Sequence, residues 1–133
     1  MKNPAHAFFT LLGRVCVASI FLYGGSDKIA NYRLMSNFMD SHHVSGHLLP
    51  LVIVLELGGG LALVLGAFTR LAAVVLAVFS VAAIWIFLLP PANSTMLIVV
   101  LAELGMVGGL LGCAAWGPGA WSLDHLWFRK SGN

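Results

Sequence analysis

The sequence predicts an all-α integral membrane protein: a bundle of four transmembrane helices, with a short amphipathic interfacial helix after the first span. Two observations support this prediction. Of the 133 residues, 59% are hydrophobic and only 9% are charged, whereas soluble domains carry about 25% charged residues. The chain also holds four apolar stretches, each long enough to cross the roughly 30 Å hydrocarbon core of a bilayer. We expect a single domain over residues 1–133.

The first predicted span covers residues 8–28 and contains Arg14. The stretch has features of a signal peptide, but the arginine interrupts its apolar core and no small-residue cleavage site follows, so we expect a retained helix. At 100° per residue, one stripe of this helix holds both cations and its small residues. We expect that stripe to face the bundle; it consists of Arg14, Ala18, Phe21, Gly25 and Lys28.

Residues 31–47 are too polar to span a membrane. Their apolar side chains recur at helical spacing, which predicts a short amphipathic helix lying at the membrane interface; these are Leu34, Met35, Phe38 and Met39. Gly46 and Pro50 bracket the turn into the next span, because proline suits the first turn of a helix.

The second predicted span, residues 48–67, carries the carboxylate of Glu56 and a glycine triplet at residues 58–60. A carboxylate in a membrane span costs at least about 2.5 kcal/mol on the insertion scale, so it normally faces protein or a wet cavity. A very short turn leads into the uncharged third span, residues 71–89, which predicts an antiparallel hairpin. Pro90 and Pro91 end the third span.

The fourth predicted span covers residues 96–115 and carries Glu103. Two small-residue pairs at GxxxG spacing are expected on its most closely packed faces; these are Gly105 with Gly109 and Gly108 with Gly112. After the turn at residues 117–119, three tryptophans are expected in an interfacial belt: Trp116, Trp121 and Trp127.

Four spans place both termini on one side of the membrane. Cytoplasmic loops carry an excess of Lys and Arg, and the termini together with the turn between spans two and three hold most of the cations. We therefore expect an inner-membrane protein with a cytoplasmic N-terminus and C-terminus. The cations on the cytoplasmic side would be Lys2, Arg14, Arg70, Arg129 and Lys130, against Lys28 and Arg33 outside.

In this orientation, Glu56 and Glu103 lie seven or eight residues from the outer ends of their helices, a depth of roughly 10–12 Å at 1.5 Å per residue. Lys28, at the outer end of the first span, can reach inward on its long stem. We therefore predict a polar or ligand-binding site in the outer half of the bundle, with Arg14 as the further candidate. The alternative is that Lys28 and Glu56 form an ion pair that only fixes helix register.

The sequence gives weaker support for metal binding, nucleic-acid binding or cysteine chemistry. His42, His43 and His47 are candidate metal ligands, but their loop lacks an HExxH-like context, and no metal is expected. The net charge of +2 is too small and too scattered to indicate nucleic-acid binding. Cys16 and Cys113 are far apart in sequence and form no CxxC pair. We identify no catalytic residue.

Several short motifs resemble those of the DoxX family of small four-helix inner-membrane proteins over nearly the full length of the chain. Arg14 matches a basic position in the first helix of that family. Its relatives often carry a Lys-Asn pair shortly before the glycines of helix four, where this chain has Ala102-Glu103. The matching motifs are Gly25-Ser26-Asp27-Lys28, Glu56-Leu57-Gly58-Gly59-Gly60, Gly66, Thr69-Arg70, Gly108-Gly109 and Gly117-Pro118-Gly119-Ala120-Trp121-Ser122-Leu123-Asp124.

The resemblance implies a role in membrane redox chemistry, since named members resemble a subunit of a thiosulfate–quinone oxidoreductase and others associate with thiol and oxidative-stress systems. Three hypotheses stay open: a subunit or accessory of a quinone- or thiol-linked redox complex, a small-molecule or proton-coupled transporter, and a structural or assembly protein. Under the first hypothesis, the chain would not be an enzyme on its own, its cofactor would be a quinone, and its partners would be the bilayer and an oxidoreductase. On the second, it would form a homo-oligomer through its glycine faces.

Overall fold

The computed structural model describes residues 3–131 and confirms the all-α prediction, since no strand occurs in that range. It contains four helical segments that are long and apolar enough to cross a membrane. Every predicted span boundary lies within four residues of the boundary in the structure. The four segments are Pro4–Ala30, Gly46–Leu65, Thr69–Leu88 and Ser94–Trp116.

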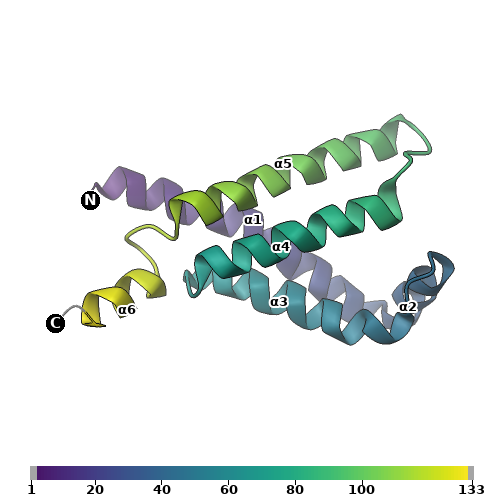
Figure 1. Cartoon of the computed structure of the whole chain (residues 1–133), viewed down its shortest axis with the longest axis horizontal. Helices are drawn as coiled ribbons and strands as arrows, with labels where there is room; N and C mark the ends of the chain where they lie inside the picture. Colours follow the sequence, from purple (N-terminus) through teal and green to yellow (C-terminus); the bar gives the residue numbers. More distant parts are fainter. Residues whose placement is uncertain (1–2, 132–133) are drawn as a thin grey trace.

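The four long segments run back and forth, so both chain ends lie at one end of the bundle and α2 lies at the other (Figure 1). We call these the terminal end and the α2 end. In chain order the elements are α1 (Pro4–Ala30), α2 (Tyr32–Ser41), the 3-10 helix η1 (Gly46–Leu48), α3 (Leu49–Leu65), α4 (Thr69–Ala83), the π-helical turn η2 (Ile84–Leu88), α5 (Ser94–Trp116) and α6 (Leu123–Ser131).

Local sequence sets most helix ends. The side chains of Asn3 and Asn93 accept hydrogen bonds from the backbone N–H groups of Ala5 (3.0 Å) and Met96 (2.8 Å), which caps α1 and α5. Helix α3 ends at Gly66, whose φ of +73° is easily adopted only by glycine. The N-termini of α2, α3 and α4 are not capped by the side chain of the residue before them.

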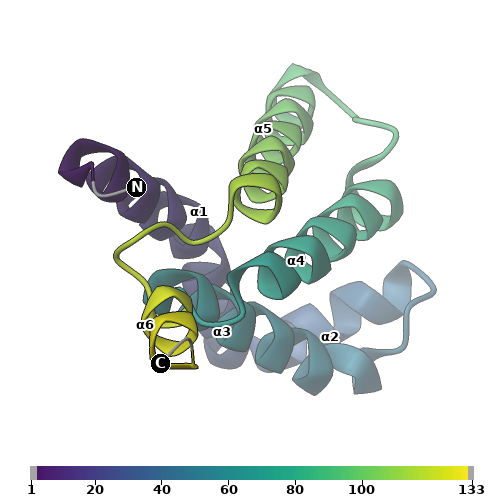
Figure 2. The same ribbon diagram turned by 60° about the vertical axis from the view of Figure 1, so that its left-hand side comes forward.

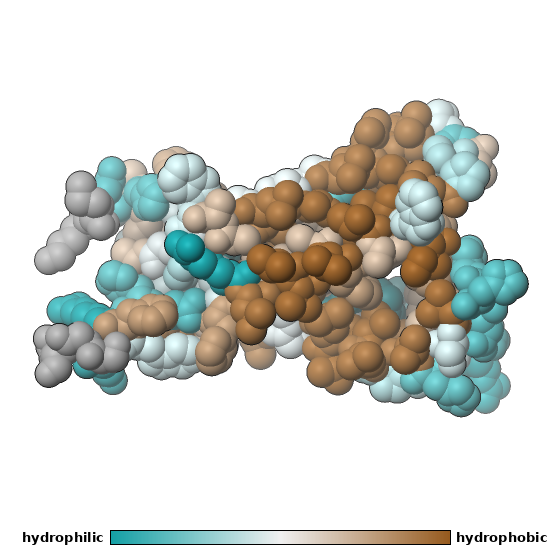
Figure 3. Space-filling model, viewed as in Figure 1, coloured by the Kyte–Doolittle hydropathy of each residue, from teal (hydrophilic) through white to brown (hydrophobic). Residues whose placement is uncertain are grey.

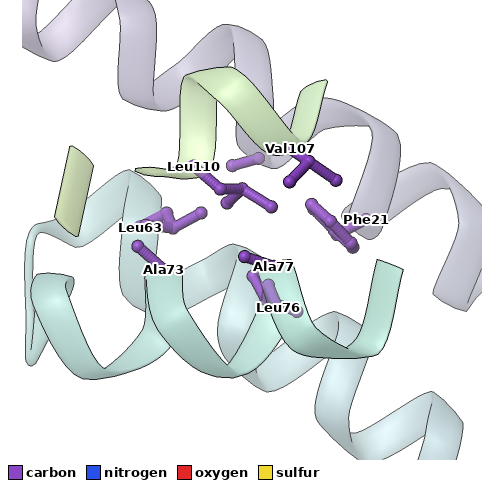
Figure 4. Close-up of a cluster of buried hydrophobic side chains, with 8 residues drawn as sticks. Phe21, Leu63, Ala73, Leu76, Ala77, Val107 and Leu110 are labelled. Carbon is purple, nitrogen blue, oxygen red and sulfur yellow. The ribbon is translucent and has the colours of Figure 1, made fainter. Parts of the chain in front are cut away.

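The main core lies between α1, α3, α4 and α5. Helix α3 packs most extensively on α1, and α5 packs mainly on α4 (Figure 2). On the face shown in Figure 3, apolar residues cover most of the spans, and polar residues gather mainly at the two ends. The core itself holds eight buried side chains: Ala18, Phe21, Leu63, Ala73, Leu76, Ala77, Val107 and Leu110 (Figure 4).

The expected inward stripe of α1 is confirmed, since Arg14, Ala18, Phe21 and Gly25 are all buried. The expected packing of the helix-four glycines is wrong for three of the four. A Cβ added at Gly105, Gly108 or Gly112 would meet nothing within 4 Å, and only Gly109 approaches a neighbour, Val17 of α1. Within the single chain, then, the GxxxG pairs do not form the helix contacts.

Candidate functional site

A half-open cavity of about 310 Å³ lies toward the α2 end, bordered by α1, α2, α3, α4, η2 and α5. Its wall is mostly apolar, and its largest side chains come from two residue types. Four phenylalanines contribute rings, and three methionines contribute flexible thioethers, which adapt to ligands of irregular shape. These are Phe21, Phe38, Phe79 and Phe87, with Met35, Met39 and Met106.

An ion pair lies in this apolar wall. The Nζ atom of Lys28 is 2.8 Å from Oε1 of Glu56, and no other ion pair between side chains occurs in residues 3–131. The Glu56 side chain is only 5% exposed, while that of Lys28 is 21% exposed. The lysine at the end of α1 therefore reaches a carboxylate buried in the middle of α3, as the sequence predicts for its long stem.

Two glycines of α1 leave the space that this ion pair needs between α1 and α3. A Cβ added at Gly24 would lie 2.8 Å from Oε2 of Glu56, and one at Gly25 would lie 2.7 Å from the side chain of Leu57. Helices α1 and α3 can approach so closely only because these two positions lack side chains. A larger residue at Gly24 would displace the carboxylate from the cavity.

Glu103 of α5 lines the same cavity and lies close enough to Glu56 and Lys28 to interact electrostatically with both. It forms neither an ion pair nor a side-chain hydrogen bond with any residue between 3 and 131. The structure thus brings together three of the four predicted site residues. Two carboxylates share a cavity with one ammonium group.

Ser80 of α4 belongs to the same wall, although we did not identify it from the sequence. It is 2% exposed, and its hydroxyl has no hydrogen-bond partner among the described residues. A buried polar group without a partner is uncommon and calls for an explanation. The available signal was that Ser80 is the only hydroxyl-bearing residue in the predicted third span.

Arg14, the fourth predicted residue, is not brought to the cavity. It lies fourteen residues before Lys28 on α1, which is about 21 Å along a helix. Its Nη1 donates to the carbonyl oxygens of Leu63 (2.8 Å) and Val64 (3.2 Å), and its Nη2 donates to that of Trp121. The guanidinium therefore caps the end of α3 and holds the loop before α6.

Asp124 of α6 has a matching role at the same end. Its two carboxylate oxygens accept hydrogen bonds from the backbone N–H groups of Phe68 (2.7 Å) and Thr69 (2.8 Å), and its own N–H donates to Gly66 (2.9 Å). It supplies the cap that α4 lacks locally. The sequence motif contained this residue, but nothing in the spacing indicated that it would cap a helix 55 residues away.

The three histidines do not form a metal site. In residues 3–131, no three His, Cys, Asp or Glu side chains come close enough to hold a metal ion. His42 instead packs beside Phe38 and Phe87, with ring centroids 4.4 and 5.2 Å away. Its ring therefore supports the aromatic part of the cavity wall where α2 meets η2.

Comparison with known proteins identifies the family. The model of the DoxX family matches residues 9–89 of the chain. Inner membrane protein YqjF of Escherichia coli K12 is 36% identical over 120 residues, which cover 90% of this chain and 92% of YqjF. The chain belongs to the DoxX family. No solved structure matches it.

The DoxX match contains only part of the cavity. Lys28, Glu56 and Ser80 lie within residues 9–89, whereas Glu103 lies beyond them on α5. The YqjF alignment is longer and covers most of the chain. With four apolar helices and a relative named as an inner membrane protein, this DoxX protein is a multi-pass membrane protein that we assign to the inner membrane.

Proposed function

We propose that the cavity binds the ring of an apolar, oxygen-bearing redox molecule of the quinone class. The chain would then be a subunit or accessory of a membrane redox system and not an enzyme by itself. The observation that carries this proposal is the Lys28–Glu56 pair, with Glu103 beside it, in an otherwise apolar wall of phenylalanine and methionine. Ligand sites are typically apolar cavities of about 300–1,000 Å³ with a few polar groups that orient the ligand.

The cavity residues suit such a ligand. The apolar rings of the wall would pack against a quinone ring and its hydrocarbon tail. Ser80, whose hydroxyl is unpartnered, and Lys28 would donate hydrogen bonds to carbonyl oxygens. A bound quinone would supply two-electron redox chemistry, with the electrons coming from a partner protein. Glu103 and Glu56 would hold and release the accompanying protons, since both carboxylates face the same cavity.

The orientation belongs to this proposal as well. The terminal end holds four of the described cations and one carboxylate, whereas the α2 end holds two cations and four carboxylates. Under the positive-inside rule, the terminal end would be cytoplasmic. The cavity would then lie in the outer half of the membrane, and α2 would lie along the outer surface.

The test compares the wild type with Glu56→Gln and Asp27→Asn after purification in mild detergent. Asp27 is a matched control, because it is an acid of α1 near Lys28 that does not line the cavity. We expect quinone, identified by mass spectrometry, to co-purify with the wild type and Asp27→Asn but to be lost from Glu56→Gln. Titration with a short-chain ubiquinone should raise the melting temperature in the same pattern. A wild type that neither retains nor binds quinone would contradict the proposal.

Proton-coupled transport of an apolar organic cation is the second candidate. It is favoured by Glu103, an acid without an ionic partner among residues 3–131, in a cavity whose phenylalanine rings can also attract a cation. Reconstituted into liposomes with a pH gradient, the wild type would then move a lipophilic cation such as tetraphenylphosphonium, and Glu103→Gln would not. Quinone binding without cation flux would reject this candidate.

A further inference from the structure

A second hollow, of about 900 Å³, lies at the terminal end, away from the cavity described above. It is bordered by the start of α1, the turn between α3 and α4, the loop before α6, and α6 itself. We call it the terminal hollow. Its wall includes His6, Arg70, Pro118, His125 and Trp127.

Arg70 is the central cation of the terminal hollow. Its guanidinium lies against Gly117, where an added Cβ would be 3.2 Å from both Nε and Nη2. It has no hydrogen bond or ion pair with a side chain of the described residues. By contrast, both terminal nitrogens of the Arg14 guanidinium donate to backbone carbonyls. The terminal hollow therefore contains a positioned cation whose hydrogen-bond donors remain available.

Other cationic and N–H-donating side chains lie at the same end of the bundle as Arg70. His6 and His125 line the terminal hollow, and Arg129 and Lys130 are exposed on α6. Among the residues that the structure describes, the one acid in its wall is Asp124, which is 8% exposed and bonded to two backbone N–H groups. The hydroxyl of Thr69, also in the wall, has no hydrogen-bond partner among residues 3–131. The available polar groups are thus mainly those that bind an anion.

Large apolar side chains share the same border. Phe68, Trp127 and Phe128 all line the terminal hollow, and the rings of Phe68 and Trp127 are 5.6 Å apart. Phe68 is 67% exposed, at the end of the apolar surface that faces lipid. Aromatic residues in such positions sit at the level of lipid headgroups. An occupant must therefore combine a negative group with hydrocarbon.

We propose that the terminal hollow binds the phosphate of an acidic phospholipid, such as phosphatidylglycerol, with Arg70 as its main contact. Basic pockets at the ends of membrane helices recognise anionic headgroups in this way. The phosphate would lie at Arg70, with the two histidines beside it, and the acyl chains would follow the aromatic rings into the bilayer. This site is separate from the cavity of Lys28 and Glu56, and its failure would leave the proposed function untouched.

The test measures lipid binding to detergent-purified protein by native mass spectrometry. The probes are phosphatidylglycerol, phosphatidylcholine and inorganic phosphate, and the variants are Arg70→Gln and Arg129→Gln. Arg33→Gln is the matched control, because Arg33 is an exposed arginine of α2 at the opposite end. We expect preferential binding of phosphatidylglycerol that weakens about fivefold in Arg70→Gln, less in Arg129→Gln, and not in Arg33→Gln. Melting curves of each variant establish that it is folded.

Three outcomes would overturn the proposal. Equal binding of phosphatidylglycerol and phosphatidylcholine would show that the negative charge is not recognised. An equal loss in Arg33→Gln would show only general attraction between charges. Displacement of the lipid by inorganic phosphate at similar concentrations would identify a free-phosphate site instead. If Arg70→Gln proves unfolded, Arg129→Gln and the salt dependence of lipid binding decide the question.

Discussion

At the terminal end, the buried charges Arg14 and Asp124 are bonded to backbone groups, whereas at the α2 end Lys28, Glu56 and Glu103 line a cavity. Arg14 donates to three carbonyl oxygens and Asp124 accepts from two N–H groups. Glu103 has no such partner in residues 3–131. Burying charge in a membrane bundle is unfavourable at both ends. Only at the terminal end do the buried charges complete the ends of helices.

The difference separates a structural role from a functional one. Helix ends leave backbone groups without intrahelical partners, and a buried charge can satisfy several of them at once. The three charges that line the cavity at the α2 end satisfy no backbone group among the described residues, and Ser80 there also lacks a partner. We therefore expect substitutions at the terminal end to lower stability, and substitutions at the α2 end to alter ligand binding with little loss of stability.

The largest expected effect is that of Arg14→Met. Three carbonyl oxygens would lose their donor, and each buried group left unpaired costs about 1–3 kcal/mol. We expect the free energy of unfolding to fall by about 3–5 kcal/mol, measured by circular dichroism during unfolding in mixed detergent and sodium dodecyl sulfate. Arg33→Met, at an exposed arginine, is the control and should change it little. A small loss of stability in Arg14→Met would show that the buried charge of the terminal end does not have the structural role described above.

A smaller effect is expected for Asp124→Ala. Removing a side-chain cap costs about 1–2 kcal/mol, and Asp124 caps the N-terminus of α4 from α6. The same unfolding assay measures the loss, and limited proteolysis should cut the segment around α6 faster than in the wild type. Unchanged stability together with unchanged proteolysis would show that α6 is not held by this carboxylate.

The fold was predictable from sequence because apolar length and composition determine what can cross a membrane. All four spans follow from these quantities, α2 follows from the helical spacing of its apolar side chains, and counting residues from the helix ends groups Lys28, Glu56 and Glu103. Arg14 belongs to the same predicted set because the sequence shows its charge but not its contacts. Its contacts with Leu63 and Trp121 join segments far apart in sequence, and spacing cannot show them.

Because spacing along the chain does not show contacts between distant segments, other features of the structure also differ from the prediction. The exposed glycines of α5 and the π-helical turn η2 depend on how neighbouring helices close, which no local pattern specifies. The aromatic and methionine wall of the cavity comes from five elements, so its parts look like ordinary apolar residues in the sequence. Beside Lys28, Glu56 and Glu103, Ser80 is the further wall residue that its polarity could have revealed.

Glu56→Gln tests the α2 end directly. Removing one partner of a buried ion pair is destabilising when the other charge stays buried and unpaired, but the Lys28 side chain is 21% exposed and its long stem can turn the charge toward water. The glutamine amide oxygen can still accept a hydrogen bond from Lys28. We expect the free energy of unfolding to change by less than about 1 kcal/mol, with loss of the bound quinone as the main effect. If stability falls as far as in Arg14→Met, the pair is structural and the contrast between the two ends fails.

Glu103→Gln has the smallest expected effect on stability and is the sharpest test of the difference. The carboxylate has no ionic or hydrogen-bond partner among the described residues, so replacing it with an amide of nearly the same shape removes a charge without breaking a contact. We expect stability to stay the same or to rise by about 0.5 kcal/mol in the same assay, since an ionised acid in a span is unfavourable.

Ser80→Ala should likewise be neutral or stabilising, because its hydroxyl is already unpartnered. Polar residues of a membrane span that the fold does not need are most simply explained by a ligand, because they are costly to bury and are usually functional. A clear loss of stability in Glu103→Gln would instead show that the acid supports the bundle, and Lys28, Glu56 and Ser80 would then remain as the candidate polar contacts of a ligand.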